Sequence, residues 1–421
     1  MKKAQRLVGG VLIFIFQRRH ILPALITLLI PSLQLAKPVS YRNIWASKCF
    51  RSPQHISHRQ YLRSMNSRHI PPRQGRQGFW PFLLAGFLIA FSPIGVYYAA
   101  SDNYRNNSIF TTALVVTGIF GLVVLITAEG LSRPPHNGPH EFVKQDEKKG
   151  KRDDDERVLV CLGDSLTHGA CSANWVDDVG PHLTKQLQNK DKMSVKVNVV
   201  NAGQNSICTH TVLHEKVDDV VACQPDYIFI MIGSNDAMAI YRDDWAKERM
   251  HTWSLTERPT EDVLIRNLTD TVKSLLDTTT ANIAIATLPP FGENFDSDSN
   301  KIIQSINCRI KTLEYLFLGE IRNTRRETGR VSVVDVNSAL WAEIIRQRSS
   351  NNITKTTHSI DKFLPYAIVM GMLHCVFGLS WNLVTRLLTG NAVLSESLHL
   401  NEYGASIVRI EVVQWVMDKM M

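Results

Sequence analysis

The chain has 421 residues, enough for two or three domains, and a formal net charge of +8. Residues 1–101 contain fourteen Lys or Arg and no Asp or Glu, so the remaining 320 residues hold 33 basic and 39 acidic side chains, a net charge of −6. The basic excess therefore belongs to the N-terminal segment. The net charge of the whole chain gives no reason to expect that the remaining residues bind nucleic acid.

Residues 1–78 form a basic segment without Asp or Glu that is rich in Ser, Arg and His. We predict a targeting or disordered segment here. Its acid-poor, Arg-rich composition is typical of mitochondrial or plastid transit segments, whereas the apolar run at residues 21–36 resembles the hydrophobic region of a secretory signal. Both destinations stay open. Three glycosylation-type sequons, at Asn106, Asn267 and Asn352, would matter only on the secretory route.

Two charge-free apolar stretches follow, at residues 79–100 and 109–128. At about 1.5 Å per residue, each is long enough to cross roughly 30 Å of hydrocarbon. Trp80 lies near one end of the first stretch and Tyr97 and Tyr98 near the other, as in an interfacial aromatic belt. Because only eight residues separate the stretches, we predict a two-helix transmembrane hairpin with both ends on the same, positively flanked side of a membrane. Two buried helices of a soluble core are the alternative.

The rest of the chain divides into a linker and one long domain. Residues 129–156 are polar and rich in Pro, Gly and charge, and we predict a linker. In residues 157–421, short and nearly continuously apolar stretches alternate with amphipathic ones, which predicts an α/β domain with a doubly wound parallel sheet. Ligands of such a sheet bind beyond the carboxyl ends of its strands. The expected strands are 157–162, 195–200, 226–232, 282–288 and 330–336, and the clearest expected helices are 175–188, 262–276 and 301–317.

Polar residues with catalytic potential stand after the first three expected strands and near the C-terminus. They are Ser165 in GDSLTHG, Gly203 in NAGQNS, Asn235 in GSNDA and His399 in SESLHLNEYGA. Taken singly, each has an ordinary structural explanation: a helix cap, a turn glycine, a loop amide and a solvated histidine. Gathered at one rim of the sheet, they supply the nucleophile, the oxyanion donors and the base that acyl transfer needs.

The ordered blocks also resemble a known family. Gly163-Asp164-Ser165-Leu166, Gly203, Gly233-Ser234-Asn235-Asp236 and His399-Leu400-Asn401 resemble the four blocks of the SGNH, or GDSL, hydrolases, over roughly residues 158–416. The resemblance implies a three-layer α/β/α, flavodoxin-like fold and hydrolysis of an ester or related acyl bond without a metal or cofactor. It also implies roles for individual residues: Ser165 as nucleophile and oxyanion donor, Gly203 and Asn235 as further oxyanion donors, His399 as the base, and Asp164 and Asp236 as structural support.

The third member of the triad departs from the family pattern. The family has Asp three residues before the catalytic His, whereas this chain has Glu396. We expect Glu396 to orient the imidazole of His399, as glutamate does in some Ser-His-Glu hydrolases. If Glu396 points to solvent instead, a backbone carbonyl would steer His399.

Other candidate residues are weaker. His168 follows the nucleophile turn without an acidic partner at triad spacing, and we expect His374, in an apolar stretch, to be packed. The seven cysteines show no CxxC spacing, and the sequence contains no HExxH motif or Cys/His cluster. We therefore predict no metal site. The apolar stretch 361–392 has three interpretations: a lid or wall over the acyl pocket, a membrane-surface segment that feeds lipid to the site, or two packing helices.

The sequence thus predicts a multi-pass membrane-anchored serine hydrolase of carboxylic esters, with small-molecule or lipid ester substrates and no nucleic-acid partner. One alternative keeps the fold and changes the reaction to glycan O-deacetylation or acyl transfer. A second alternative, motivated by the glutamate at position 396, is a catalytically silent SGNH domain that serves as a membrane-tethered binding module.

Overall fold

The computed structural model describes residues 86, 88–90, 92–93, 96–97, 108–150, 152–191, 195–324, 330–351 and 360–420. All of them belong to one unit, His58–Met421. The predicted targeting segment at 1–78, most of the first predicted span, and the sequon residues Asn106 and Asn352 lie outside the described residues.

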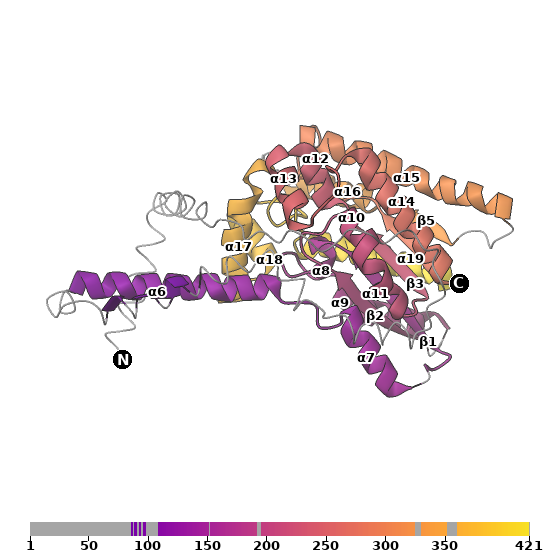
Figure 1. Ribbon diagram of the computed structural model, residues 1–421, viewed down its shortest axis with the longest axis horizontal. Coiled ribbons are helices and arrows are strands. Elements are labelled where there is room, and N and C mark those ends of the chain that lie inside the picture. The colour runs from indigo at the N-terminus through magenta and orange to yellow at the C-terminus, as the bar shows by residue number, and fades with distance from the viewer. Residues whose placement is uncertain are drawn as a thin grey trace. The chain divides into compact units, whose positions relative to one another are not determined.

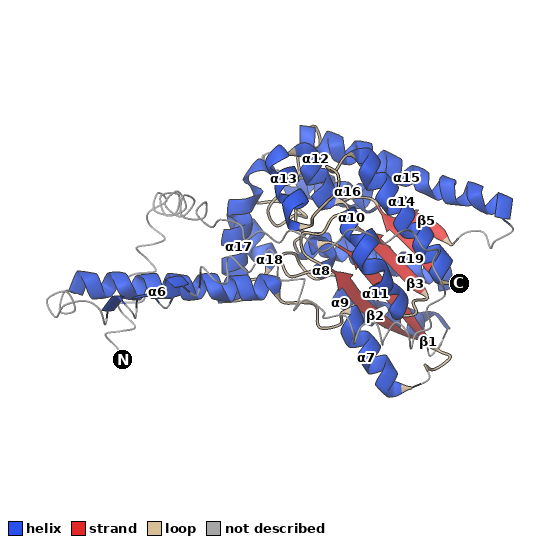
Figure 2. Ribbon diagram, in the orientation of Figure 1, coloured by secondary structure: helices blue, strands red, loops and turns tan. Residues whose placement is uncertain are grey.

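Five parallel strands form one sheet in the order β2-β1-β3-β4-β5 (Figure 2). Each strand overlaps its predicted stretch, so the predicted α/β fold with a parallel sheet is confirmed. The strands are β1 (Glu156–Gly163), β2 (Lys196–Gly203), β3 (Tyr227–Met231), β4 (Asn282–Ala286) and β5 (Val331–Val334).

Helices cover both faces of this sheet and form two separate cores with it (Figure 1). Successive side chains of a strand point to opposite faces. In β1, Val158 and Val160 therefore enter one core, whereas Leu159 and Cys161 enter the other. This double burial is why the strands read as continuous apolar runs. The first core includes helices α11 (Val217–Ala222), α14 (Glu261–Thr278) and α15 (Asp298–Thr324), and the second includes α9 (Val176–Asp191), α16 (Val336–Asn351) and α19 (Glu402–Met420).

Helix α14 shows how the local sequence fixes an element of these layers. The Thr260 hydroxyl caps it by accepting from the Val263 N–H at 3.2 Å, and Glu261 and Asp262 place negative charge in its first turn. Its sequon residue, Asn267, is buried in the helix, so the folded domain does not present that amide as a glycosylation acceptor. The buried apolar stripe consists of Leu264, Leu268, Val272 and Leu275.

The strand register brings the ends of the three central strands level. Gly163 of β1 pairs with Gly203 of β2 on one side and with Met231 of β3 on the other. The segments that follow these strands therefore leave the sheet at one rim. Short helices occupy this region: α8 (Ser165–His168), α10 (Thr209–Thr211), the π-helix η2 (Val212–Lys216), α12 (Ser234–Tyr241) and α13 (Asp243–Thr252).

The second predicted span lies in helix α6 (Ser108–Ser132). Among the described residues, Phe110–Ser132 is the one helix long and apolar enough to cross a membrane. The described parts of the first predicted span are helical and pack on α6: a methyl group on Gly86 would lie 3.0 Å from Cγ of Leu125, and one on Gly121 would lie 2.2 Å from the nitrogen of Ala90. The complete hairpin extends outside the described residues and stays a prediction.

The predicted linker, residues 129–156, contains a helix that the composition did not predict. Helix α7 (Pro139–Lys149) begins with Pro at a position that needs no N–H, and it has Glu141 in its first turn and lysines in its last. Its Val143 is buried in the first core, and the Asn201 N–H donates to the Asn137 carbonyl at 3.0 Å. This segment is therefore packed against the sheet and does more than space two parts of the chain.

The apolar stretch 361–392 folds into helices α17 (Phe363–Phe377) and α18 (Trp381–Leu388), preceded by the short 3-10 helix η3 (Ile360–Lys362). Helix α17 contacts both α18 and α6. The segment between α18 and α19 then returns to the rim of the sheet with Glu396 and His399.

Candidate active site

Ser165 begins a tight helical turn directly after β1. The carboxylate of Asp164 caps this turn by accepting from the Leu166 N–H at 3.0 Å, while the Asp164 carbonyl accepts from the N–H groups of Thr167 and His168. As the first residue of α8, Ser165 has no partner for its own N–H within the helix. Asp164 thus fixes the turn that carries Ser165, a residue that is 8% exposed.

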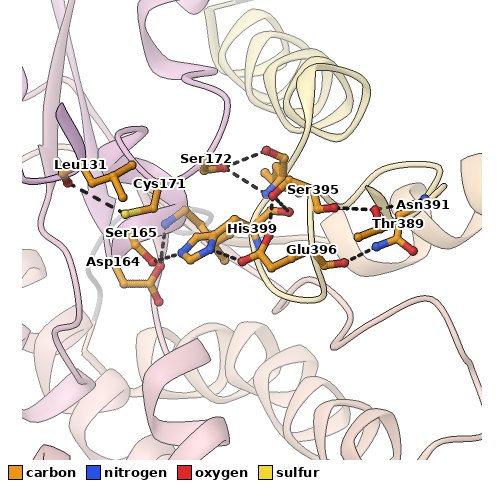
Figure 3. Close-up of polar contacts among 12 residues, drawn as sticks. Leu131, Asp164, Ser165, Cys171, Ser172, Thr389, Asn391, Ser395, Glu396 and His399 are labelled. Atoms are coloured by element: carbon orange, nitrogen blue, oxygen red, sulfur yellow. Dashed lines mark hydrogen bonds and ion pairs between the residues drawn. The ribbon is translucent and has the colours of Figure 1, made fainter. Parts of the chain in front are cut away.

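The structure brings Ser165, His399 and Glu396 into one hydrogen-bonded line (Figure 3). Oγ of Ser165 lies 3.0 Å from Nε2 of His399, although 234 positions separate the two residues. Nδ1 of His399 bonds Oε1 of Glu396, and the His399 backbone N–H donates to the same carboxylate at 3.3 Å. Glu396 points away from solvent and is only 2% exposed. The extra methylene of glutamate is therefore accommodated, and the carboxylate of Glu396 lies against the imidazole of His399.

The charges of this buried pair support each other. Burial by itself would raise the pKa of Glu396, but the charge of His399 and hydrogen bonds from His399 and Ser395 hold that pKa below its ordinary value. Burial likewise disfavours a charged imidazole, yet Glu396 outweighs it, so the pKa of His399 is raised above its ordinary value. An imidazole that takes a proton from Ser165 would be stabilised in its charged form by this carboxylate.

The loop that carries Glu396 and His399 is held from several directions. A bridge joins Leu394 to Leu400, and the Ser395 N–H donates to the His399 carbonyl at 2.7 Å. Ser172, in the segment after the nucleophile turn, bonds both backbone groups of Leu400 through its hydroxyl, accepting at 3.0 Å and donating at 3.3 Å. The loop is thereby tied to the part of the chain that carries Ser165.

Glu293 is a further anchor of this loop that the sequence analysis missed. Its carboxylate accepts the backbone N–H groups of Ala392 at 2.9 Å, Val393 at 2.8 Å and Leu394 at 3.1 Å, and Arg348 lies 3.5 Å from it. Burial raises the pKa of Glu293, while these donors act in the opposite direction. The sequence could have indicated Glu293, because the string Gly-Glu-Asn at positions 292–294 follows β4, whose carboxyl end lies at the same rim of the sheet.

The predicted oxyanion donors differ in availability. The amide of Asn235 donates to the Ile207 carbonyl at 3.1 Å, which leaves its second hydrogen for a ligand. The Gly203 N–H donates instead to Oδ1 of Asn201 at 2.9 Å, so the protein itself engages this predicted donor. Glycine is nevertheless needed at position 203, because a methyl group there would lie 2.3 Å from the backbone nitrogen of His168. Gly203 therefore allows α8 to approach β2.

Asp236 connects the third block to the segment after β2. Its two carboxylate oxygens accept from the N–H of Thr209 at 3.0 Å and from the Thr209 hydroxyl at 2.7 Å. Burial raises the pKa of Asp236 to about 6, and burial likewise raises that of Asp164 to about 6. Both aspartates thus hold loops in place from buried positions.

His168 and His374, the two weaker histidine candidates, lie in packed positions and bond backbone groups outside the Ser165–His399–Glu396 line. His168 is buried, accepts from the Ala170 N–H at 3.3 Å, and has its pKa lowered to about 4 by burial. His374 stacks on Trp381 with ring centroids 4.4 Å apart, and its Nδ1 lies 2.7 Å from the Leu379 carbonyl oxygen. Among the described residues, no group of three or more His, Cys, Asp or Glu is placed to hold a metal ion.

Comparison with known proteins gives one family and several solved structures. Residues 161–314 match the GDSL-like Lipase/Acylhydrolase family. The acetylxylan esterase Axe2 from Geobacillus stearothermophilus is similar over 61% of this chain and 93% of its own, with 17% identity and a TM-score of 0.38. The acetyl xylan esterase AlAXEase is similar over 62% of this chain and 99% of its own, with 15% identity and a TM-score of 0.38. The comparison with curated proteins gave no match.

Proposed function

We propose that this chain, whose residues 161–314 match the GDSL-like lipase/acylhydrolase family, is a membrane-anchored serine esterase with a Ser-His-Glu triad. The observation that carries the proposal is the 3.0 Å contact between Oγ of Ser165 and Nε2 of His399, whose other ring nitrogen bonds the buried carboxylate of Glu396. A nucleophile, a base and an orienting acid in this order are what acyl-enzyme chemistry needs.

In the proposed reaction, Oγ of Ser165 attacks the acyl carbon of the ester while Nε2 of His399 takes the hydroxyl proton. His399 then gives that proton to the alcohol oxygen, the C–O bond breaks, and the acyl group stays on Ser165. Water attacks the acyl-enzyme with His399 again as base, which releases the carboxylic acid and restores the hydroxyl. Glu396 stabilises the imidazolium in both halves of the reaction.

The oxyanion that forms in both halves needs donors at the rim. The Ser165 N–H at the start of α8 and the second amide hydrogen of Asn235 are the donors best supported by the hydrogen bonds around them. The Gly203 N–H would contribute only after leaving Oδ1 of Asn201.

The membrane part of the proposal rests on α6 and on its contacts with Gly86, Ile89 and Ala90. Only 11% of the residues in the most apolar part of α6 are buried, and large apolar side chains such as Val115, Ile119 and Leu122 are exposed. Alkaline carbonate extraction of membranes that contain the full chain tests this part. We expect the chain to stay in the membrane pellet, and release into the supernatant would contradict anchoring.

Labelling with a fluorophosphonate probe tests the nucleophile. We expect the wild-type full chain and the control Ser338→Ala, exposed on α16, to be labelled, and Ser165→Ala not to be labelled. The full chain is required because Val143 of α7 belongs to the core. An unlabelled wild type would favour a silent binding domain, and labelling of Ser165→Ala would identify a different nucleophile.

A panel of esters then addresses the reaction class. Short-chain and long-chain acyl esters and an acetylated oligosaccharide, each assayed with the full chain, separate the proposed carboxylic ester hydrolysis from glycan O-deacetylation. Product analysis with an added alcohol acceptor separates hydrolysis from acyl transfer. Preference for the oligosaccharide, or transfer to the acceptor, would replace the proposed reaction by one of these alternatives.

A further inference from the structure

The C-terminal end of α6 is embedded in the domain next to the active-site loops. Thr127, Ala128 and Ser132 of this end are buried, unlike most of the helix. The carbonyl of Leu131, which cannot find a partner further along the helix, accepts from the Asn205 side-chain amide at 2.9 Å, and the thiol of Cys171 lies 3.9 Å from it (Figure 3). Asn205 follows β2 and Cys171 follows the Ser165 turn. The end of α6 therefore lies at the catalytic rim.

Helix α17 packs across this same end of α6. A methyl group on Gly130 would lie 2.7 Å from Sγ of Cys375, and one on Gly371 would lie 2.9 Å from Cδ1 of Leu131. The two glycines thus allow close helix contact. Gly371 and Cys375 are one turn apart, so one face of α17 is turned toward α6.

That face of α17 continues beyond α6 as an uncovered apolar surface. Leu364 and Ile368 precede Gly371 and Cys375 at spacings of four, three and four residues, which places all of them on one stripe of the helix. Leu364 is 50% exposed and Ile368 41% exposed. The whole of α17 contains no Asp, Glu, Lys or Arg. One half of the stripe therefore covers the end of α6, and the other half is partly exposed in the part of the chain that the structure describes.

The neighbouring helix α18 exposes a second apolar pair. Leu387 is 64% exposed and Leu383, one turn earlier, is 41% exposed, while Phe377 at the end of α17 is 56% exposed. The opposite side of α18 is buried through Trp381 and Val384. Large apolar side chains are thus exposed on α17, which contacts α6, and on α18, which packs on α17. Exposed apolar patches of this kind indicate a contact surface.

We propose that Leu364, Ile368, Leu383 and Leu387 form a membrane-contact surface that lies in the interfacial layer of the bilayer crossed by α6. The occupant is lipid because the stripe is continuous with the contact to α6, which itself exposes large apolar side chains such as Val115, Ile119 and Leu122. The surface holds the catalytic rim against the bilayer, so the substrates are esters of amphiphiles that reside in the membrane. This inference rests on the proposed membrane anchor and goes beyond it by naming the second contact and the source of the substrate.

Photocrosslinking in phosphatidylcholine vesicles tests the surface directly. The photoreactive amino acid p-benzoyl-phenylalanine replaces Ile368 in one full-length variant, Ile119 of α6 in a second, and Ile410 of α19 in a third; Ile119 and Ile410 are each 56% exposed. We expect a phospholipid adduct, detected by mass spectrometry, at positions 368 and 119 and none at 410.

The outcomes separate this inference from the anchor on which it rests. An adduct at 119 without one at 368 overturns the membrane-contact surface and leaves the anchor intact. Adducts at neither position overturn both. A crosslink at 368 to a second copy of the chain identifies a dimer interface and also overturns the inference.

A kinetic comparison tests the link to substrate. The double variant Leu364→Ser/Ile368→Ser should keep its rate on a water-soluble acetate ester within about twofold. Its rate on a long-chain ester presented in phosphatidylcholine vesicles should fall by about tenfold or more, because two apolar side chains leave the interface. The matched variant Ile345→Ser/Ile410→Ser, with both residues exposed on α16 and α19, should change neither rate. If the Leu364→Ser/Ile368→Ser variant keeps the wild-type rate on both esters, or loses the same factor on both, the proposed role is contradicted.

Discussion

Replacement of Glu396 by glutamine is the sharpest test of the proposed triad. Three donors converge on its carboxylate: the imidazole Nδ1–H and backbone N–H of His399, and the hydroxyl of Ser395. A glutamine amide has one oxygen, so its NH₂ group would face at least one of these donors in a buried site. Breaking a buried charged pair costs about 3–5 kcal/mol. If this cost is added to the activation free energy, the rate falls on the order of 10³-fold.

The pH profile distinguishes loss of orientation from general damage. Without Glu396, only the charge of Asp164 opposes the effect of burial on His399. The pKa of His399 should therefore fall, and the acid limb of kcat/KM should move to lower pH while the maximum falls. Hydrolysis of p-nitrophenyl acetate by the detergent-solubilised full chain measures both effects. Ser395→Ala, which removes one donor and leaves the Nδ1 bond, is the control and should lose less than about tenfold. A Glu396→Gln rate within about tenfold of wild type, with an unmoved acid limb, would refute the orienting role.

Three further predictions follow from the same site. In the wild type, kcat/KM should fall as the pH drops through a value above about 6.5, because His399, whose pKa is raised, then becomes protonated and cannot act as the base. A pH–rate profile with its acid limb well below that value would contradict this prediction. Glu293→Gln should lower kcat about tenfold or more, because its amide NH₂ would face backbone N–H groups of the loop that carries His399. An unchanged kcat would show that the loop does not need this anchor. Gly203→Ala should lower kcat about a hundredfold and also lower the melting temperature, because the methyl group must displace α8 and Ser165; a variant with wild-type kcat would show that α8 yields without moving the nucleophile.

Much of the fold could be predicted from the sequence because strand burial is a local pattern. Apolar runs such as residues 226–232 predict buried parallel strands, and the level strand ends then bring the segments after Gly163, Gly203 and Met231 to one rim. Composition was misleading at residues 129–156. The polarity of α7 hides two apolar side chains, Phe142 and Val143, that pack on the first core.

The sequence by itself determined the α/β architecture, the order of the catalytic blocks and the apolar length of α6, since these depend on residue types at fixed spacing. Only the tertiary structure decided that Glu396 turns inward to His399, that Asn201 engages the Gly203 N–H, and that Glu293 anchors a loop about a hundred positions away. The physical reason is that a hydrogen-bonding group takes its partner from whatever the fold brings within about 3 Å, and spacing along the chain carries no information about that distance.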